Sequence, residues 1–160
     1  MHKLLLFTFF FLLTSSFSAQ KKNLKAYLDL QEFYHPSIGS YIEIQLQFSS
    51  ISTHLKNIGD SALQSSLVVY MDIFDTDSLV ASDSYILNSP QFLLRDSIVE
   101  DFFEIKRFAL NEGNYTLKLE LQDLGDSSKN KINGSEKFTI ESKKNVSSFS
   151  DITMAEYAVP

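Results

Sequence analysis

Apolar and polar residues alternate along most of the chain after Leu24. The clearest segment is Tyr41–Phe48, in which Ile42, Ile44, Leu46 and Phe48 alternate with polar residues, and Tyr115–Gln122 repeats the pattern. A strand that buries one face has this period of two. The sequence therefore predicts a half-buried strand in each segment.

Weaker versions of the same pattern predict further strands at Lys25–Tyr34, Ser52–Lys56, Ala62–Phe74, Leu79–Leu87 and Glu136–Ser142. Residues typical of turns separate these segments. Within the third one, Val68–Phe74 is apolar on both faces apart from Asp72, which predicts a strand in the middle of a sheet.

The stretch 98–110 fits two structures. Ile98, Phe102 and Ile105 fit helical spacing, and Asp96 or Ser97 is suited to cap a helix. Phenylalanine is a poor helix former, and the neighbouring segments are all strand-like. We therefore favour a strand here.

Short strands separated by turns, without helices between them, indicate an antiparallel sandwich rather than a parallel α/β sheet. We predict one immunoglobulin-like or fibronectin-like β-sandwich of seven to nine strands in residues 20–142. Residues 143–160 read as a linker whose last part, rich in apolar residues, either docks on the sandwich edge or starts a further element.

The first residues resemble a secretory leader. Lys3 precedes the apolar run Leu4–Leu13, which is too short to span a bilayer, and small residues around Ala19 suit signal peptidase. We assign 1–19 to a signal peptide and expect export to the periplasm, the cell surface or the medium, with no membrane insertion after cleavage. Cysteine is absent, which excludes disulfides and lipid attachment to a cysteine.

The charge distribution argues against a nucleic-acid partner. Loss of Lys3 with the leader changes the net charge from −6 to −7, and the close basic pairs Lys21 with Lys22 and Lys143 with Lys144 flank the domain. Affinity for phosphates needs clustered basic residues.

The sequence offers weak candidates for chemistry. Asp72, Asp75 and Asp77 could present oxygens to Ca²⁺, but an EF-hand loop starting at Asp75 would need glycine and a carboxylate where Val80 and Ile86 stand. We favour a hairpin turn whose aspartates bond backbone N–H groups.

The histidine and serine residues give no convincing metal or catalytic site. His35 and His54 are too few for a zinc site, and Ser128 with Lys131 matches Ser-x-x-Lys without its companion motifs. We expect no catalytic residue, no cofactor and no metal, and hence no enzyme.

Four segments resemble the N-terminal region of exported bacterial proteins that carry a GWxTD motif further along their chain. They are Tyr85–Pro90, Arg107–Leu117, Leu121–Leu124 and Ser150–Ile152. The resemblance covers about residues 25–153, but the chain has no tryptophan, so the motif itself is absent. It implies a sandwich and export, and it carries no activity over.

From these features we expect an exported, non-catalytic module that binds protein or glycan or acts as a spacer. The alternative is the non-catalytic N-terminal part of a longer secreted enzyme or secretion-linked protein, whose functional site lies beyond residue 160.

Overall fold

The computed structural model describes residues 23–59, 61–93, 95 and 99–141. The predicted leader and residues 143–160 lie outside this part of the chain. The described residues form ten strands and one short 3₁₀ helix. The seven long strands are β1 (Ala26–His35), β2 (Gly39–Phe48), β5 (Ser66–Asp75), β6 (Ser78–Asn88), β8 (Phe102–Ala109), β9 (Gly113–Asp123) and β10 (Lys131–Ile140). The short elements are η1 (Ser50–Ser52), β3 (Lys56–Ile58), β4 (Ala62–Gln64) and β7 (Phe92–Leu93).

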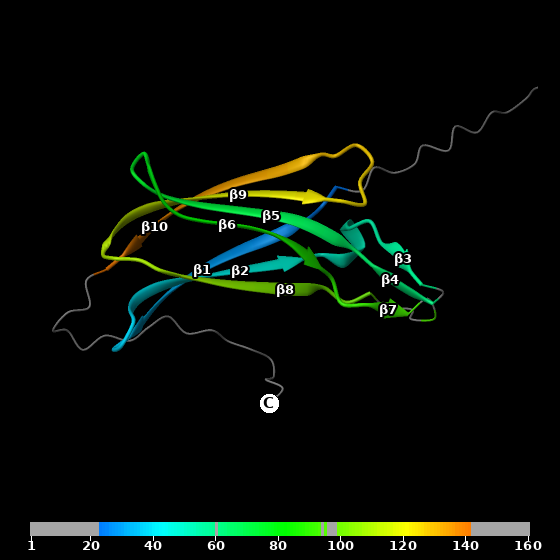
Figure 1. Cartoon of the computed structure of the whole chain (residues 1–160), viewed down its shortest axis with the longest axis horizontal. Helices are drawn as coiled ribbons and strands as arrows, with labels where there is room; N and C mark the ends of the chain where they lie inside the picture. Colours follow the sequence, from blue (N-terminus) through cyan, green and yellow to red (C-terminus); the bar gives the residue numbers. More distant parts are fainter. Residues whose placement is uncertain (1–22, 60, 94, 96–98, 142–160) are drawn as a thin grey trace, which may run out of the picture.

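The long strands form the two layers of an antiparallel β-sandwich (Figure 1). One sheet has the order β1-β2-β8 and the other the order β10-β9-β5-β6. The chain crosses between these two sheets from β2 to β5, from β6 to β8 and from β8 to β9. The predicted fold class is confirmed, with seven long strands inside the expected range and three short ones that bring the total among the described residues to ten.

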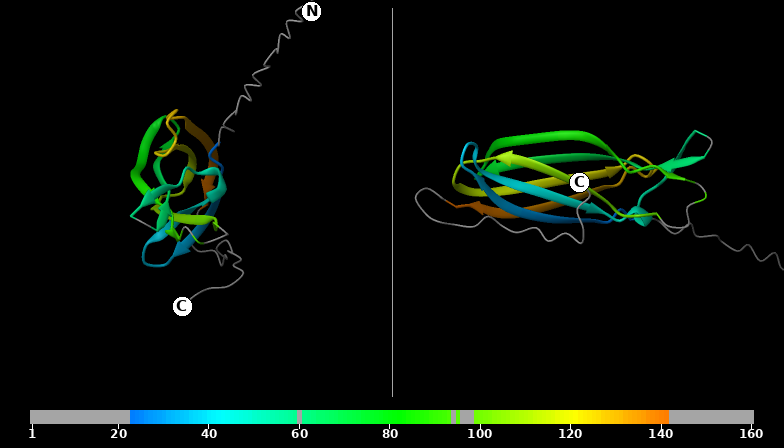
Figure 2. Two further views of the ribbon diagram at one scale, coloured as in Figure 1. Left: turned by 90° about the vertical axis from the view of Figure 1, so that its right-hand side faces the viewer. Right: turned by 90° about the horizontal axis from the view of Figure 1, so that it is seen from below.

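The core lies between the two layers, and the end-on view shows the long strands around it (Figure 2). Every second residue of β2, β5 and β9 points inward, as the alternation predicts. Leu46, Met71 and Leu117 are each fully buried. Burial of such a side chain stabilises the fold by about 1.5–3 kcal/mol. β5 pairs with both β6 and β9, so its predicted place inside a sheet is confirmed.

The predicted strand Ser52–Lys56 is wrong. Its first residue ends η1, and only Lys56 belongs to a strand. The hydroxyls of Ser52 and Thr53 donate to the backbone carbonyls of Ser49 and Ser50, at 2.5 and 2.9 Å. Such local bonds favour a tight turn over an extended ladder.

The predicted strand Ala62–Phe74 is two strands. β4 pairs with β3 and β7 in the small sheet at one end of the molecule, whereas β5 belongs to the four-stranded sheet (Figure 1). The chain changes sheets at Ser65, whose backbone N–H donates to the Ser89 hydroxyl at 3.1 Å and whose carbonyl accepts from the Ser89 N–H at 3.0 Å.

Two further strands have bounds that differ from the predicted ones. The ambiguous stretch 98–110 contains strand β8, so the strand interpretation is confirmed over 102–109, while Ile98 lies outside the described residues. β10 starts at Lys131 and ends at Ile140, although the sequence predicted a strand only from Glu136.

Candidate functional site

The outer face of the three-stranded sheet carries four rows of side chains that cross β1, β2 and β8. The register gives these rows as Tyr27–Gln47–Phe103, Asp29–Gln45–Ile105, Gln31–Glu43–Arg107 and Phe33–Tyr41–Ala109. They point away from the core because the residues between them in each strand pack inward. We call these twelve residues the three-strand face.

The first row exposes two aromatic rings. Tyr27 is 61% and Phe103 65% exposed, and Gln47 lies between them. Since neighbouring strands lie about 4.8 Å apart, the two side chains start about 10 Å from each other. Ile105, in the next row, is 46% exposed. Exposed apolar side chains gathered in one place mark interaction surfaces more often than isolated ones do.

A hydrogen-bonded polar group occupies the middle of the three-strand face. The Arg107 Nε donates to Glu43 Oε2 at 2.7 Å, and the Gln45 amide donates to Glu43 Oε1 at 2.9 Å. The Gln31 amide donates to Asp29 Oδ2 at 2.8 Å. Glu43 is only 7% exposed although it lies on the outer side of the sheet, since these side chains cover it. The centre of the face is therefore ordered before any partner arrives.

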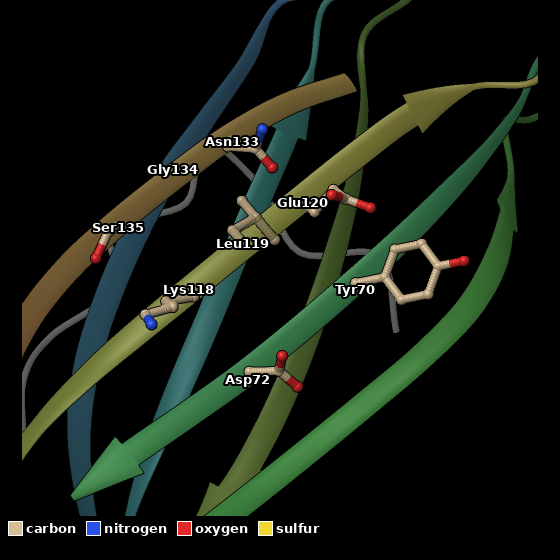
Figure 3. A pocket seen from close by; sticks show the side chains of 8 residues that line it. All are labelled: Tyr70, Asp72, Lys118, Leu119, Glu120, Asn133, Gly134 and Ser135. Carbon is tan, nitrogen blue, oxygen red and sulfur yellow. The ribbon is translucent and has the colours of Figure 1, made fainter. Parts of the chain in front are cut away.

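The opposite face of the sandwich, on the four-stranded sheet, holds an open groove of about 450 Å³ (Figure 3). It is lined by Tyr70, Asp72, Lys118, Leu119, Glu120, Asn133, Gly134 and Ser135. Some polar groups of the groove already interact with other side chains, and others are open to a ligand.

Two charged groups of the groove are already engaged. Glu120 accepts from Lys131 Nζ at 2.6 Å, which raises the pKa of that lysine, and Lys118 Nζ lies 4.4 Å from the centre of the Phe74 ring. The side chains of Asn133 and Ser135, by contrast, make no hydrogen bond to other described residues. Amide and hydroxyl groups of this kind can bond the hydroxyls of a sugar.

The three aspartates proposed for Ca²⁺ lie on and after β5 but are not gathered into a site. Asp72 Oδ1 accepts from the Ser82 hydroxyl at 2.6 Å across the β5–β6 pair. Asp75 ends β5 and Asp77 lies in the turn before β6. No group of three or more histidine, aspartate or glutamate side chains within the described ranges is placed to hold a metal ion.

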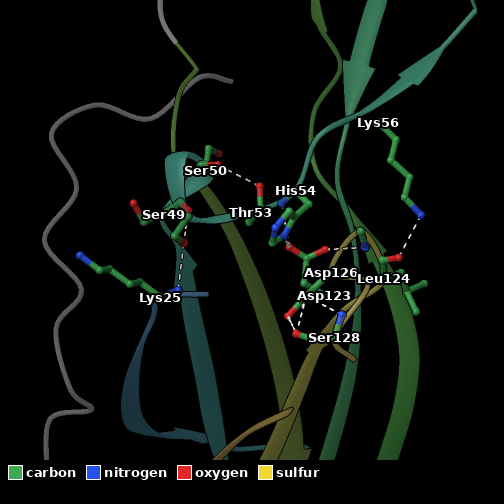
Figure 4. Close-up of polar contacts among 12 residues, drawn as sticks. Lys25, Ser49, Ser50, Thr53, His54, Lys56, Asp123, Leu124, Asp126 and Ser128 are labelled. Atoms are coloured by element: carbon green, nitrogen blue, oxygen red, sulfur yellow. Dashed lines mark hydrogen bonds and ion pairs between the residues drawn. The ribbon is translucent and has the colours of Figure 1, made fainter. Parts of the chain in front are cut away.

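His54 belongs to a polar cluster at one end of the sandwich (Figure 4). Its backbone N–H donates to Asp123 Oδ2 at 2.7 Å, and its Nδ1 lies 3.0 Å from the same oxygen. Asp123, which is 3% exposed, also accepts from the Gly125 N–H at 2.7 Å. The pair fastens the segment before β3 to the end of β9, so we assign it a structural role.

The sequence did not single out Asp123, although one signal was present. Asp123 has the same phase in β9 as Leu119 and Leu121, so alternation places its carboxylate on the inner side. A polar residue at such a position needs partners when buried.

The other sequence candidates are separated or exposed. His35 ends β1, where its Nδ1 accepts from the Ser37 N–H at 3.2 Å. The Ser128 hydroxyl bonds to the Asp126 carboxylate within its turn, while Lys131 bonds to Glu120. Ser128 and Lys131, the two residues of the Ser-x-x-Lys match, thus bond to different partners and not to each other.

Comparison of the chain with protein-family models, with curated proteins and with solved structures found no match. Nowhere in the described part of the chain is there a helix with the length and apolar character needed to cross a bilayer.

Proposed function

We propose that the chain is an exported, non-catalytic binding module that contacts a partner protein through the three-strand face. The observation that carries the proposal is the row in which Tyr27 and Phe103, both more than 60% exposed, flank Gln47. Aromatic residues and arginine are enriched at protein interfaces, and the face combines both kinds of residue around an ordered centre.

Glycan is the second candidate ligand, and the groove on the four-stranded sheet favours it. Tyr70 is 42% exposed and offers a ring for stacking beside Asn133 and Ser135. Tyrosine, amide and hydroxyl groups suit a neutral sugar. A glycan bound there would leave the three-strand face uncovered, so the two candidates predict different footprints.

The proposal also includes export, which rests on Lys3, the apolar run Leu4–Leu13 and the residues around Ala19. The resemblance to the N-terminal region of GWxTD proteins supports the same compartment. It also supports the alternative that the module precedes a functional region beyond residue 160. Sequencing the DNA downstream of the Pro160 codon separates the two: a reading frame that continues into a GWxTD motif favours the longer protein.

Two double variants test the binding face. Tyr27→Ser with Phe103→Ser removes the aromatic row. Ile38→Ser with Ile51→Ser removes a similar exposed area from the β1–β2 turn and from η1, since these isoleucines are 66% and 73% exposed. Each variant, immobilised, is incubated with proteins of the compartment to which the chain is exported. We expect one retained protein that the loop variant keeps and the face variant loses.

The same material is applied to a glycan array. Binding of a glycan that survives in the face variant and is lost in Tyr70→Ala would replace the protein proposal with the glycan one. Equal retention by both double variants would contradict a role of the three-strand face.

A further inference from the structure

The three-strand face is arranged symmetrically about β2, its central strand (Figure 1). In the first row an aromatic ring lies on each outer strand, Tyr27 on β1 and Phe103 on β8, with Gln47 between them on β2. A two-fold axis along β2, in a plane just above the face, would exchange β1 with β8. A second copy of the chain related by this axis would thus present the same rows in the opposite order.

The first row is complementary to itself under this exchange. Tyr27 of each copy lies over Phe103 of the other, so the two exposed rings form two pairs. Pairs of aromatic rings contribute to binding beyond the area that they bury. Gln47 meets Gln47 of the second copy on the axis, where one amide can donate to the other. The exchange therefore covers both exposed rings of the row.

The fourth row places a bulky side chain opposite a small one. Phe33 on β1 stacks on Tyr41 of β2 with 5.5 Å between the ring centroids, whereas Ala109 on β8 carries only a methyl group. The exchange puts Phe33 of each copy over Ala109 of the other. Protein interfaces pack as closely as protein interiors, so a surface that is high on one strand and low on the other fits its own two-fold image.

The charges of the face are also complementary under the exchange. Asp29 lies on β1 and Arg107 on β8, so opposite charges occupy opposite sides of β2. Asp29 of one copy faces Ile105 of the other, and Arg107 of that copy follows about 7 Å further along the strand. Arg107 bonds Glu43 through Nε, and its other guanidinium N–H groups bond no other described residue. They can reach the exposed Asp29 carboxylate of the second copy.

One pair of like charges lies on the axis. Glu43 is on β2, so the Glu43 side chains of the two copies approach each other. Each is only 7% exposed and accepts hydrogen bonds from Arg107 and Gln45 of its own copy. The arginine beside each carboxylate offsets the repulsion between them.

The contact is small. Neighbouring strands lie about 4.8 Å apart and successive outward residues about 7 Å apart, so the three-strand face covers about 400 Å². Two copies would bury about 800 Å² in total, which is less than the roughly 1,200 Å² at which stable interfaces begin. We therefore expect a reversible dimer with a dissociation constant above about 1 μM.

We propose that the partner of the three-strand face is a second copy of this chain, packed face to face about a two-fold axis along β2. The two sheets then lie about 10 Å apart with their strands aligned to within about 30°, as in other face-to-face sheet packings. Each contact occurs twice, as in any two-fold interface. The inference rests on the proposed function, because it names the partner of the same face.

Sedimentation equilibrium measures the self-association. The chain, purified as the producing cell processes it, is examined from about 10 μM to about 1 mM, a range that suits weak dimers. We expect the mass to rise from one copy toward two. Tyr27→Ser with Phe103→Ser should raise the dissociation constant about tenfold or more, since buried aromatic rings dominate such contacts. Ile38→Ser with Ile51→Ser should leave it unchanged.

A matched pair of charge variants tests the contact between Asp29 and Arg107. Asp29→Arg brings two arginines together and should raise the dissociation constant about fivefold or more. Asp77→Arg makes the same change of net charge in the β5–β6 turn. Because both copies are acidic, this control should leave the dimer unchanged or strengthen it. Circular dichroism checks that each variant keeps the fold.

A cross-link locates the axis. The chain has no cysteine, so one introduced cysteine gives a single attachment point. Gln47→Cys lies on the proposed axis, and a short bismaleimide should join two of these copies into a covalent dimer. Ser84→Cys is exposed on the outer side of β6, in the other sheet, and should stay monomeric.

Three results would overturn the inference: a mass of one copy at every concentration, equal self-association of the two double variants, or cross-linking of Ser84→Cys as efficient as that of Gln47→Cys. The retention experiment tests the proposed function separately. A different protein retained through the aromatic row by a chain that stays monomeric would keep the three-strand face as a binding site. It would remove the second copy as the partner.

Discussion

The hydroxyl of Tyr115 donates a hydrogen bond to the backbone carbonyl of Asn111 at 3.0 Å. The bond ties the start of β9 to the loop that leads into it, and the Tyr115 ring stacks on Phe138 of β10 at 5.5 Å between centroids. A tyrosine in this place, bonded to backbone a few residues upstream, is the corner that immunoglobulin-like sandwiches use between their fifth and sixth strands. Tyr115 thus fixes the loop through which the chain passes from the three-stranded sheet to the four-stranded sheet.

Tyr115→Phe should lower the free energy of unfolding by about 0.5–1.5 kcal/mol, because it removes the hydrogen bond and keeps the ring. Urea unfolding followed by circular dichroism measures the loss. Tyr70→Phe is the control, since Tyr70 is 42% exposed on the outer face. An equal loss in both variants would show that the corner contributes nothing of its own.

The tyrosines should also govern stability at alkaline pH. Burial raises the pKa of Tyr115, with a further effect from Asp75, and burial likewise raises the pKa of Tyr85. A folded-state pKa above the ordinary value of 10.0 favours the neutral form in the folded protein. The contribution of these two tyrosines to the free energy of unfolding is therefore complete below pH 10. It is lost as the pH rises through their pKa values in the folded protein.

The absorbance of tyrosinate, recorded during titration of the folded protein and of the protein in urea, checks this expectation. We expect Tyr85 and Tyr115 to ionise at higher pH in the folded protein than in urea. The step that belongs to Tyr85 should be missing in Tyr85→Phe, and the step that belongs to Tyr115 should be missing in Tyr115→Phe. Simultaneous ionisation of all tyrosines in the folded state would refute it.

Gly125 has no room for a side chain. A Cβ at this position would lie 2.4 Å from His54 Cβ and 2.7 Å from the His54 carbonyl oxygen. Gly125→Ala should therefore force the His54–Asp123 cluster apart and destabilise the protein by about 1–3 kcal/mol. Gly134→Ala, which meets no atom, should be neutral or stabilising in the same urea titration. The reverse order of stability would contradict the close packing of this end.

Calcium should have no effect on the chain. Asp72 is bonded to Ser82, and Asp75 and Asp77 are not joined by further ligands in the described residues. Calorimetric titration with Ca²⁺ and thermal unfolding with and without it measure this. Binding heat and a raised melting temperature, both removed by Asp75→Asn, would instead establish a calcium site.

Alternation predicted the strands that bury one full face and failed where burial or local bonding breaks the pattern. β2 and β9 were predicted because their inner residues lie in the core. The first half of β10 was missed because its inner side is exposed, and Gly134 and Glu136 at inward positions carry no apolar signal. The division at Ser65 was missed because a change of sheet depends on distant partners such as Ser89.

The candidate face was only partly readable from the sequence. Once the stretch 98–110 is predicted to be a strand, period two places Phe103 and Ile105 on one side of it. The row that joins Tyr27 to Phe103 depends on the register of β1 and β8 against β2, which involves residues 76 positions apart in the sequence. Local patterns do not contain that register.

Photo-crosslinking in the producing cell tests the central claim most directly. A benzoylphenylalanine is introduced at Phe103, on the three-strand face, or at Ile51, which is 73% exposed in η1, and the adducts formed under ultraviolet light are separated by size and identified by mass spectrometry. We predict one discrete protein adduct from position 103 and none from position 51. The absence of an adduct at position 103, or the same adduct from both positions, would contradict binding through the three-strand face.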